Sequence, residues 1–187
     1  MNPSFAHIFV SLRGMLLYLL AALMVVVSPP SAVSQAEDMR LLMPVKVKPP
    51  ALDFMLEDLN GKTWQLQNLK GKVVVINFWA TSCPVCRVEM PTLQKFWRRM
   101  KKVDVQVLTI HVGGSEREVR DFVKSHDLEL PVLHDPFKRV ARAWGVFRLP
   151  ITFVLNTDGK LAYIAFGGRN WLNPEIASMI MALRPPL

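Results

Sequence analysis

The chain has 187 residues, 51% of them hydrophobic, and no internal repeats or low-complexity tracts, which indicates one folded domain plus an appendage and excludes a repeat protein. Its 23 basic and 15 acidic side chains give a net charge of +8, but no motif of interleaved aromatic and basic residues accompanies this excess, so no nucleic-acid partner is expected. Only two cysteines are present, and a domain of this length can bury a core without a structural disulfide.

The N-terminal segment 1–36 has the pattern of an export signal. An apolar run of 13 residues, Met15–Val27, follows Arg13 and ends at Ser28-Pro29-Pro30. The run is shorter than the roughly 20 residues that cross a bilayer comfortably, and it fits the apolar core of a secretory signal peptide.

Cleavage and retention are two alternatives for this segment. Small residues at Ala32-Val33-Ser34 and at Ser34-Gln35-Ala36 offer two cleavage sites. Residues 5–12 are also largely apolar, so an uncleaved membrane anchor is the alternative. Both alternatives place the rest of the chain outside the cytoplasm.

The next two stretches predict a linker and then a β-hairpin. Residues 37–50 contain three prolines and no strong periodicity, which is typical of a linker, so the folded domain is expected to cover 51–187. Alternating residues in 52–57 and 62–66 flank Asn60-Gly61, and this pattern is a strong hairpin signal.

The residues after the hairpin predict a central strand that leads into a helix. Val73–Trp79 is a short, β-branched apolar run, as a strand covered on both faces requires. A helix capped by Thr81 or Ser82 is expected to follow, with both cysteines in its first turn and a proline at a position where the missing N–H costs nothing.

Both sulfurs are therefore expected at a helix N-terminus. There the unpaired N–H groups and the positive end of the helix dipole favour an anion and lower the pKa of a thiol. A drop in pKa from about 8.5 to about 7 raises the thiolate fraction at neutral pH from a few per cent to about half. Cys83 is the expected nucleophile, and Cys86 is expected to resolve a mixed disulfide formed on it.

Half of a zinc site is the alternative interpretation of a Cys-x-x-Cys pair. Such a site needs two further Cys or His ligands at short spacing. No other cysteine exists, and His111, His126 and His134 are scattered, so a redox dithiol is favoured and no metal is expected. His134 is the one histidine whose loop is expected to approach the cysteines, although a bystander role is the simpler interpretation.

The elements from residue 84 onward alternate between helices and strands. Pro91 is expected to kink the first helix, and Ser115-Glu116-Arg117-Glu118 has the form of a capping box that opens the next. Together with the central strand, these elements predict an α/β thioredoxin fold, a mixed sheet flanked by helices, with the hairpin as an N-terminal extension. The expected helices cover 84–100, 115–126, 135–144 and 173–184, and the expected strands cover 103–112, 131–134, 151–156 and 160–167.

From residue 50 onward the chain resembles the TlpA/ResA-like branch of the thioredoxin superfamily. The resemblance lies in Val-Val-Val-Ile-Asn-Phe-Trp-Ala-Thr at 73–81, in Cys-x-x-Cys-Arg-x-Glu-Met-Pro at 83–91 and in Leu-Pro-Ile-Thr at 149–152. Members of that branch are membrane-tethered or secreted thiol:disulfide oxidoreductases of bacteria.

The resemblance implies a set of substrate-binding residues. Pro150 is expected as a cis residue that faces the cysteines, with an ordinary trans proline as the alternative. Leu149 is expected to offer backbone hydrogen bonds to an extended substrate. Pro84 and Val85 are expected to contact the substrate between the cysteines. Trp79, as the last residue of the central strand, is expected to be a packing residue that also walls the same site.

Glu89 is the expected proton-exchange partner of the two thiols. It falls where the TlpA/ResA-like branch has an acidic residue, and the alternative is a first-turn glutamate that stabilises the helix N-terminus. Asn77 stands where thioredoxins proper carry a buried acid, which strengthens the case for Glu89. Ser82 replaces the tryptophan usual in the branch, so an apolar surface beside the nucleophile is lost.

These features predict an extracytoplasmic thiol:disulfide oxidoreductase that acts as a reductase and needs no cofactor beyond its cysteine pair. The resemblance implies an integral-membrane thiol donor and substrates such as apocytochrome c or copper-site assembly proteins, at the periplasmic face of a bacterial inner membrane. A copper-binding or delivery protein is the alternative, since thiolates suit Cu(I). A peroxidase of the peroxiredoxin type is weaker, because such enzymes do not use the resolving route that Cys-Pro-Val-Cys offers.

Overall fold

The computed structural model of the chain describes residues 41–185. The signal peptide or anchor expected for 1–36 lies outside the described residues, as do residues 37–40 of the expected linker. Within 41–185, no helix combines the length and the apolar character that crossing a bilayer requires.

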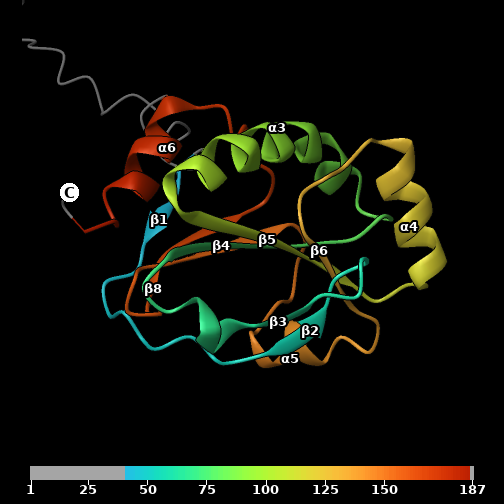
Figure 1. The fold of residues 1–187 in the computed structure, drawn as a ribbon, viewed down its shortest axis with the longest axis horizontal. Helices are drawn as coiled ribbons and strands as arrows, with labels where there is room; N and C mark the ends of the chain where they lie inside the picture. Colours follow the sequence, from blue (N-terminus) through green and yellow to red (C-terminus); the bar gives the residue numbers. More distant parts are fainter. Residues whose placement is uncertain (1–40, 186–187) are drawn as a thin grey trace, which may run out of the picture. The chain divides into compact units, whose positions relative to one another are not determined.

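A six-stranded mixed sheet forms the centre of the domain, in the strand order β1-β8-β7-β4-β5-β6 (Figure 1). The central strand β4 pairs in parallel with β5, which pairs in parallel with β6. On its other side β4 pairs antiparallel with β7, and β7 pairs antiparallel with β8. The strands are β1 (Met43–Pro44), β4 (Val73–Trp79), β5 (Val105–Val112), β6 (Val132–Asp135), β7 (Ile151–Leu155) and β8 (Leu161–Phe166).

A separate two-stranded hairpin and four α-helices complete the domain. The hairpin pairs β2 (Met55–Glu57) with β3 (Thr63–Gln65), as Asn60-Gly61 predicts. The mixed sheet flanked by helices confirms the expected thioredoxin fold. The helices are α3 (Pro84–Met100), α4 (Glu116–Ser125), α5 (Arg139–Ala143) and α6 (Pro174–Met181), and two 3-10 turns lie at Leu66–Leu69 and Lys101–Val103.

All seven residues of β4 are buried, because both faces of the sheet are covered. Figure 1 shows α3 and α6 on one face and α5 with the hairpin on the other. Side chains of β4 alternate between the two layers, so Val75 and Trp79 join the core under α3, whereas Val74 and Ile76 join the core that contains Trp64 of the hairpin. This double coverage explains the uninterrupted apolar sequence of the strand.

The described part of the expected linker adds an edge strand to the sheet. Strand β1 pairs antiparallel with β8, and Val45 N–H donates to the Ala162 carbonyl at 2.9 Å. Further along, Leu161 N–H donates to the Pro49 carbonyl at 2.9 Å. The backbone of 43–50 thus supplies hydrogen-bond partners that β8 would otherwise lack on this side, which the proline content of the segment does not reveal.

The helix expected to open at Asp135 begins four residues later, at Arg139. Asp135 is instead the last residue of β6, and Lys138 adopts a left-handed conformation at φ 56° between the two elements. The Asp135 carboxylate accepts the N–H groups of Arg139 at 2.8 Å and Ala141 at 2.9 Å. It therefore stabilises the start of α5 from the end of the strand.

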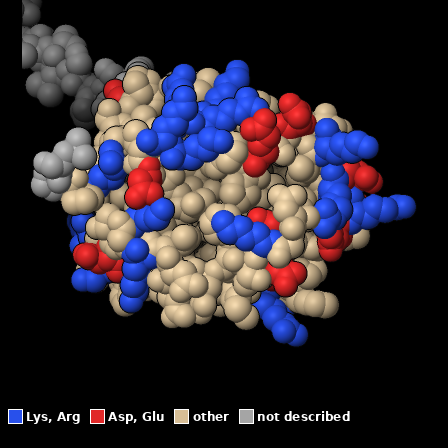
Figure 2. Space-filling view, viewed as in Figure 1, with Lys and Arg blue, Asp and Glu red and all other residues tan. Residues whose placement is uncertain are grey.

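Lys and Arg side chains gather over the C-terminal half of α3 (Figure 2). Arg98 pairs there with Glu129 at 2.9 Å, with both side chains about half exposed, and the Lys101 ammonium lies 4.3 Å from the ring centre of Trp97. Because the cysteines lie at the opposite end of α3, this basic surface is separate from them.

Candidate active site

The two cysteines lie where β4 passes into α3. A turn follows the strand, closed by a hydrogen bond from Cys83 N–H to the Ala80 carbonyl at 3.1 Å. Cys83 itself is the N-cap of α3, and its sulfur accepts the N–H of Cys86 at 3.2 Å. The expected cap at Thr81 or Ser82 is wrong, because the extended backbone of Cys83 (φ −92°, ψ 108°) delays the start of the helix to Pro84.

Cys83 and Cys86 form a disulfide with a Cα–Cα distance of 5.3 Å. The two sulfurs differ in accessibility, since Cys83 is partly exposed and Cys86 is fully buried. An incoming thiolate can therefore reach the disulfide only from the Cys83 side. The expected nucleophile, Cys83, is thus the accessible sulfur, and the expected resolving residue, Cys86, lies behind it.

The peptide bond between Leu149 and Pro150 is cis, as the resemblance implies. Pro150 is buried and Leu149 partly buried, and β7 begins directly after them. The register of β7 against β4 places Ile151 opposite Phe78 and Thr152 opposite Asn77. The cis bond is thereby held at the end of the sheet where β4 leads to the cysteines.

Exposed apolar side chains flank the disulfide on the helix side. Val85, expected to contact substrate, is 52% exposed, and Pro84 beside it is exposed as well. Val88, one turn further along α3, is 78% exposed. Phe147 lies on the loop before the cis bond, not on the helix, and is 72% exposed. Sequence reasoning missed the last two, although the three-residue spacing of Val85 and Val88 indicates a shared helix face.

Trp79 cannot contact a substrate in this structure, because none of its side chain is exposed. Its ring packs instead against His111 at 4.8 Å and against Phe122 at 5.1 Å between ring centres. The expected packing role of Trp79 is thus confirmed, whereas the expectation that it also walls the substrate site is wrong, because the side chain is fully buried in the core.

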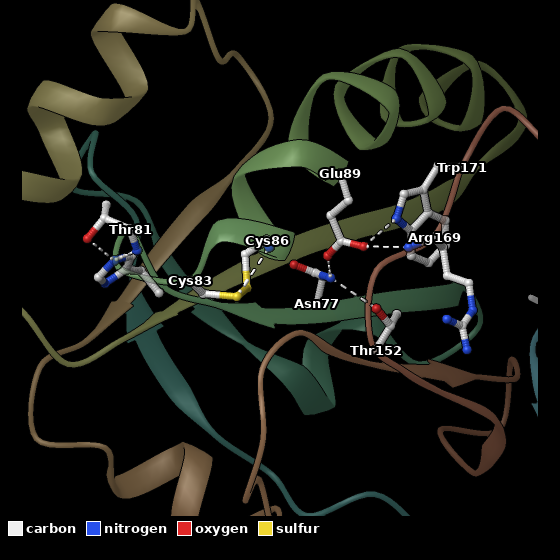
Figure 3. The surroundings of a disulfide bond; sticks show 9 residues. Asn77, Thr81, Cys83, Cys86, Glu89, Thr152, Arg169 and Trp171 are labelled. Atoms are coloured by element: carbon white, nitrogen blue, oxygen red, sulfur yellow. Dashed lines mark hydrogen bonds between the residues drawn. A yellow bond between two sulfur atoms is a disulfide. The ribbon is translucent and has the colours of Figure 1, made fainter.

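Glu89 is a buried carboxylate on the inner face of α3, only 3% exposed. One carboxylate oxygen accepts from the Asn77 amide at 2.8 Å, and the other accepts from Arg169 N–H at 2.9 Å and the Trp171 indole at 3.4 Å (Figure 3). Burial raises the pKa of Glu89, and the hydrogen bonds from Arg169, Asn77 and Trp171 offset part of this rise. The alternative of a first-turn glutamate is wrong, because the first turn of α3 holds no acidic residue.

Asn77 links Glu89 to the sheet. Its amide nitrogen donates both to Glu89 and to the Thr152 hydroxyl, the latter at 3.0 Å. Its amide oxygen is buried without a hydrogen-bond partner, and Figure 3 shows this oxygen on the side of the amide that faces the disulfide. Arg169 and Trp171, which complete the surroundings of Glu89, carry no sequence signal because they lie about eighty residues away in the chain.

His111, and not His134, contacts the turn before the cysteines. Its ring nitrogen Nε2 accepts the Thr81 N–H at 2.9 Å. His134 lies next to it, with 5.8 Å between ring centres, and bonds to the Gly113 carbonyl at 3.1 Å. The histidine singled out from the sequence therefore sits one strand further from the cysteines than the one that touches their turn.

The sequence of this chain is similar to a protein family and to named relatives. The sequence profile of the AhpC/TSA family matches residues 47–164. The thiol-disulfide oxidoreductase ResA of Bacillus subtilis is 38% identical over 117 residues, which cover 63% of this chain and 65% of ResA. The chain thus spans just under two thirds of the length of that relative.

Two solved structures share the fold. A protein from Chlorobium tepidum assigned as a thiol:disulfide interchange protein DsbE matches with a TM-score of 0.68 and 25% identity, over 74% of this chain and 98% of that one. A protein from Neisseria meningitidis assigned as a thioredoxin matches with a TM-score of 0.64 and 32% identity, over 71% of this chain and 88% of that one.

Proposed function

This chain belongs to the AhpC/TSA family, and from that premise we propose that it is a thiol-disulfide oxidoreductase whose redox centre is the Cys83–Cys86 pair. The proposal is carried by the unequal exposure of two bonded sulfurs that share the first turn of one helix. The exposed sulfur can exchange with a partner, and the buried one can react only with its neighbour.

In the reduced protein, the Cys83 thiolate attacks a substrate disulfide. The substrate S–S bond breaks, one substrate sulfur bonds to Cys83, and the other leaves as a thiolate that takes up a proton. Cys86 then loses its proton, and the resulting thiolate attacks the Cys83 sulfur. The bond between Cys83 and the substrate breaks, and the bound substrate sulfur leaves as a thiolate that takes up a proton. Two electrons have passed to the substrate, and the Cys83–Cys86 disulfide remains.

Glu89 is the proposed acceptor and donor of the Cys86 proton. Burial raises the pKa of Glu89, so its carboxyl holds a proton at a higher pH than an exposed glutamate does and can exchange that proton with a thiol. The arrangement supports this role because Glu89 and Cys86 lie one turn apart on the buried face of α3. The proton on the leaving substrate sulfur comes from solvent at the exposed Cys83 side.

The proposed substrates are proteins that dock an extended segment against the cis-proline loop. Leu149 offers backbone groups there, and Pro84 and Val85 supply the exposed apolar surface. We place the domain on the extracytoplasmic side, as a reductase recharged by an integral-membrane thiol donor, with apocytochrome c or copper-site assembly proteins as substrates. The export pattern of 1–36 and the resemblance to the TlpA/ResA-like branch support this placement.

A trapping experiment with Cys86→Ser tests the proposal. Without the resolving sulfur, Cys83 should accumulate mixed disulfides in the native host, which non-reducing gels and mass spectrometry would identify. Cys83→Ser is the matched control and should trap nothing, because Cys86 is buried. An empty trap under both oxidising and reducing growth would overturn the proposal, and a copper-delivery role would instead show as stoichiometric copper in the purified protein.

A further inference from the structure

A buried histidine lies under the turn that carries the nucleophile. His111 is 1% exposed, and the register of β5 places it opposite Trp79 of β4. Its Nε2 accepts the N–H of Thr81, which comes two residues after the end of β4 and two residues before Cys83. Figure 3 shows Thr81 and Glu89 on opposite sides of the disulfide.

Two hydrogen bonds fix the protonation and orientation of the His111 ring. Because a backbone N–H can only donate, Nε2 must carry the lone pair that receives Thr81. Because a carbonyl can only accept, Nδ1 must carry the hydrogen that it donates to the Gly113 carbonyl at 2.9 Å. The ring also stands nearly perpendicular to Trp79, at an interplanar angle of 89°, and this contact holds it in place.

Cys83 is fixed by the disulfide and by the Arg87 N–H, which its carbonyl accepts at 3.2 Å, but the middle of the turn, Thr81 and Ser82, has few contacts other than the one with His111. One hydrogen bond closes the turn, from Cys83 N–H to the Ala80 carbonyl. Thr81 is only partly buried and Ser82 is exposed, so packing constrains them little. The lone pair of His111 is therefore a main anchor of the segment that sets the position of the Cys83 sulfur.

We propose that His111 is a positioning residue for Cys83, which holds the Thr81 amide so that the sulfur stays aligned with the N–H groups at the start of α3. The inference rests on the proposed function. In the reduced protein the same alignment would let the Cys83 thiolate accept the Cys86 N–H, as the sulfur does here at 3.2 Å. Loss of the anchor would leave the thiolate less stabilised and the cysteine less reactive near neutral pH.

The surroundings of His111 keep the ring neutral. Burial lowers the pKa of His111 to about 4, the Gly113 hydrogen bond opposes this shift, and the neighbouring His134 adds to it. Glu118 of α4 is the acidic group whose charge acts on the ring, in the direction that raises the pKa. Near pH 7 the lone pair on Nε2 is thus available to Thr81.

The test compares His111→Leu with His111→Gln in the full chain. Leucine removes both hydrogen bonds, whereas glutamine retains an oxygen that can accept Thr81 and an amide that can donate to Gly113. After reduction, the rate of Cys83 alkylation by iodoacetamide is measured from pH 5 to 9. We expect His111→Leu to slow alkylation at pH 6 about three- to tenfold, with the pH profile moved to higher pH, and glutamine to restore most of the loss.

His134→Leu is the matched control, because His134 shares the Gly113 carbonyl but makes no bond to the turn. It should change the alkylation rate less than twofold, or about 0.4 kcal/mol at most. Equal effects of His111→Leu and His134→Leu, or equal effects of leucine and glutamine at 111, would overturn the proposal.

A measurement on the unmodified protein guards against variants that do not fold. The Thr81 amide hydrogen should exchange slowly at pH 7 and lose protection in step with protonation of His111, both followed by NMR; free exchange at pH 7 would contradict the proposal. None of these measurements needs a substrate. A failed Cys86→Ser trap with a normal His111 effect would therefore refute the proposed function alone.

Discussion

The two sides of the disulfide are built differently. On the Cys83 side, a partly exposed sulfur meets helix N–H groups and a turn held by a neutral imidazole. On the Cys86 side, a buried sulfur lies on the same helix face as Glu89, a carboxyl whose pKa is raised by burial. Burial thus favours the uncharged form of both titratable groups, the unprotonated imidazole of His111 on the Cys83 side and the protonated carboxyl of Glu89 on the Cys86 side.

This difference assigns separate tasks to the two sulfurs. Fixed N–H dipoles stabilise a thiolate without exchanging protons, which suits the sulfur that must attack first. A carboxyl that can gain and lose a proton suits the sulfur that must be deprotonated during the reaction. Substitutions beside Cys83 should therefore change the rate of its attack on a substrate disulfide, and substitutions beside Cys86 should change the rate at which Cys86 releases the substrate from Cys83.

The largest expected effect is on the resolving step, in which Cys86 displaces the substrate from Cys83. Glu89→Gln keeps the size of the side chain but cannot exchange a proton, so we expect release of a mixed disulfide by Cys86 to slow about 100-fold. Stopped-flow measurement with a disulfide peptide resolves the two steps, and alkylation of Cys83 should stay within about threefold. Glu129→Gln is the matched control, because Glu129 is an exposed carboxylate on the loop after α4 that pairs with Arg98 near the C-terminal end of α3. Equal slowing of both steps by Glu89→Gln would remove the distinction between the two sides.

The next effect concerns stability in acid. The pKa of His111 is about 4 in the folded protein and 6.5 ordinarily, so the unfolded chain binds the proton more tightly and stability falls as the pH drops from about 6.5 to about 4. Between pH 7 and pH 4.5 this group should cost about 2 kcal/mol of unfolding free energy. Urea titrations of His111→Gln should show a correspondingly smaller loss of unfolding free energy in acid. A loss equal to that of the parent protein would show that the His111 ring is solvated in the folded protein.

Glu89 should produce the opposite dependence on pH. Because burial raises the pKa of Glu89, the folded protein keeps this proton where the unfolded chain has lost it, and stability falls as the pH rises through the raised pKa. Glu89→Gln should flatten this decline in unfolding free energy, measured by urea titrations at increasing pH, beginning at the ordinary glutamate pKa of 4.5. A decline identical to that of the parent would mean that the carboxylate is ionised at no cost.

The smallest effect is expected far from the disulfide, on the basic surface in Figure 2. Arg98 and Glu129 form an ion pair between half-exposed side chains, and such pairs contribute at most about 1 kcal/mol. Arg98→Ala should therefore lower the unfolding free energy by less than about 0.5 kcal/mol and leave both reaction steps unchanged. A measurable loss of Cys83 reactivity would show that the far end of α3 communicates with its first turn.

Local patterns made much of the fold and the centre of the site predictable. The apolar run of β4, the cysteines after it and the hairpin around Asn60-Gly61 each depend on a few adjacent residues. The cis bond at Pro150 followed from a resemblance carried by the short motif at 149–152. These features share one property: their causes lie close together in the chain.

Features that depend on distant pairing were not predictable. The contact of His111 with Thr81 arises from the register of β5 against β4, and Arg169 reaches Glu89 through the loop after β8. A packing role for Trp79 was predictable from its place at the end of β4, but its full burial was not, because that depends in part on Phe122 of a later helix. The edge strand β1 likewise exists only because β8 offers it a partner.

Whether Cys83 and Cys86 form a reversible dithiol couple is decided by a redox titration of the purified protein. The protein is equilibrated in buffers of varied glutathione ratio, starting once from the oxidised and once from the reduced form, and free thiols are counted by alkylation and mass spectrometry. We expect one reversible two-electron transition in which Cys83 and Cys86 change state together and both starting forms give the same curve. A cysteine pair that stays in its starting state at every glutathione ratio, or a lasting difference between the two curves, would show that Cys83 and Cys86 are not a reversible redox couple.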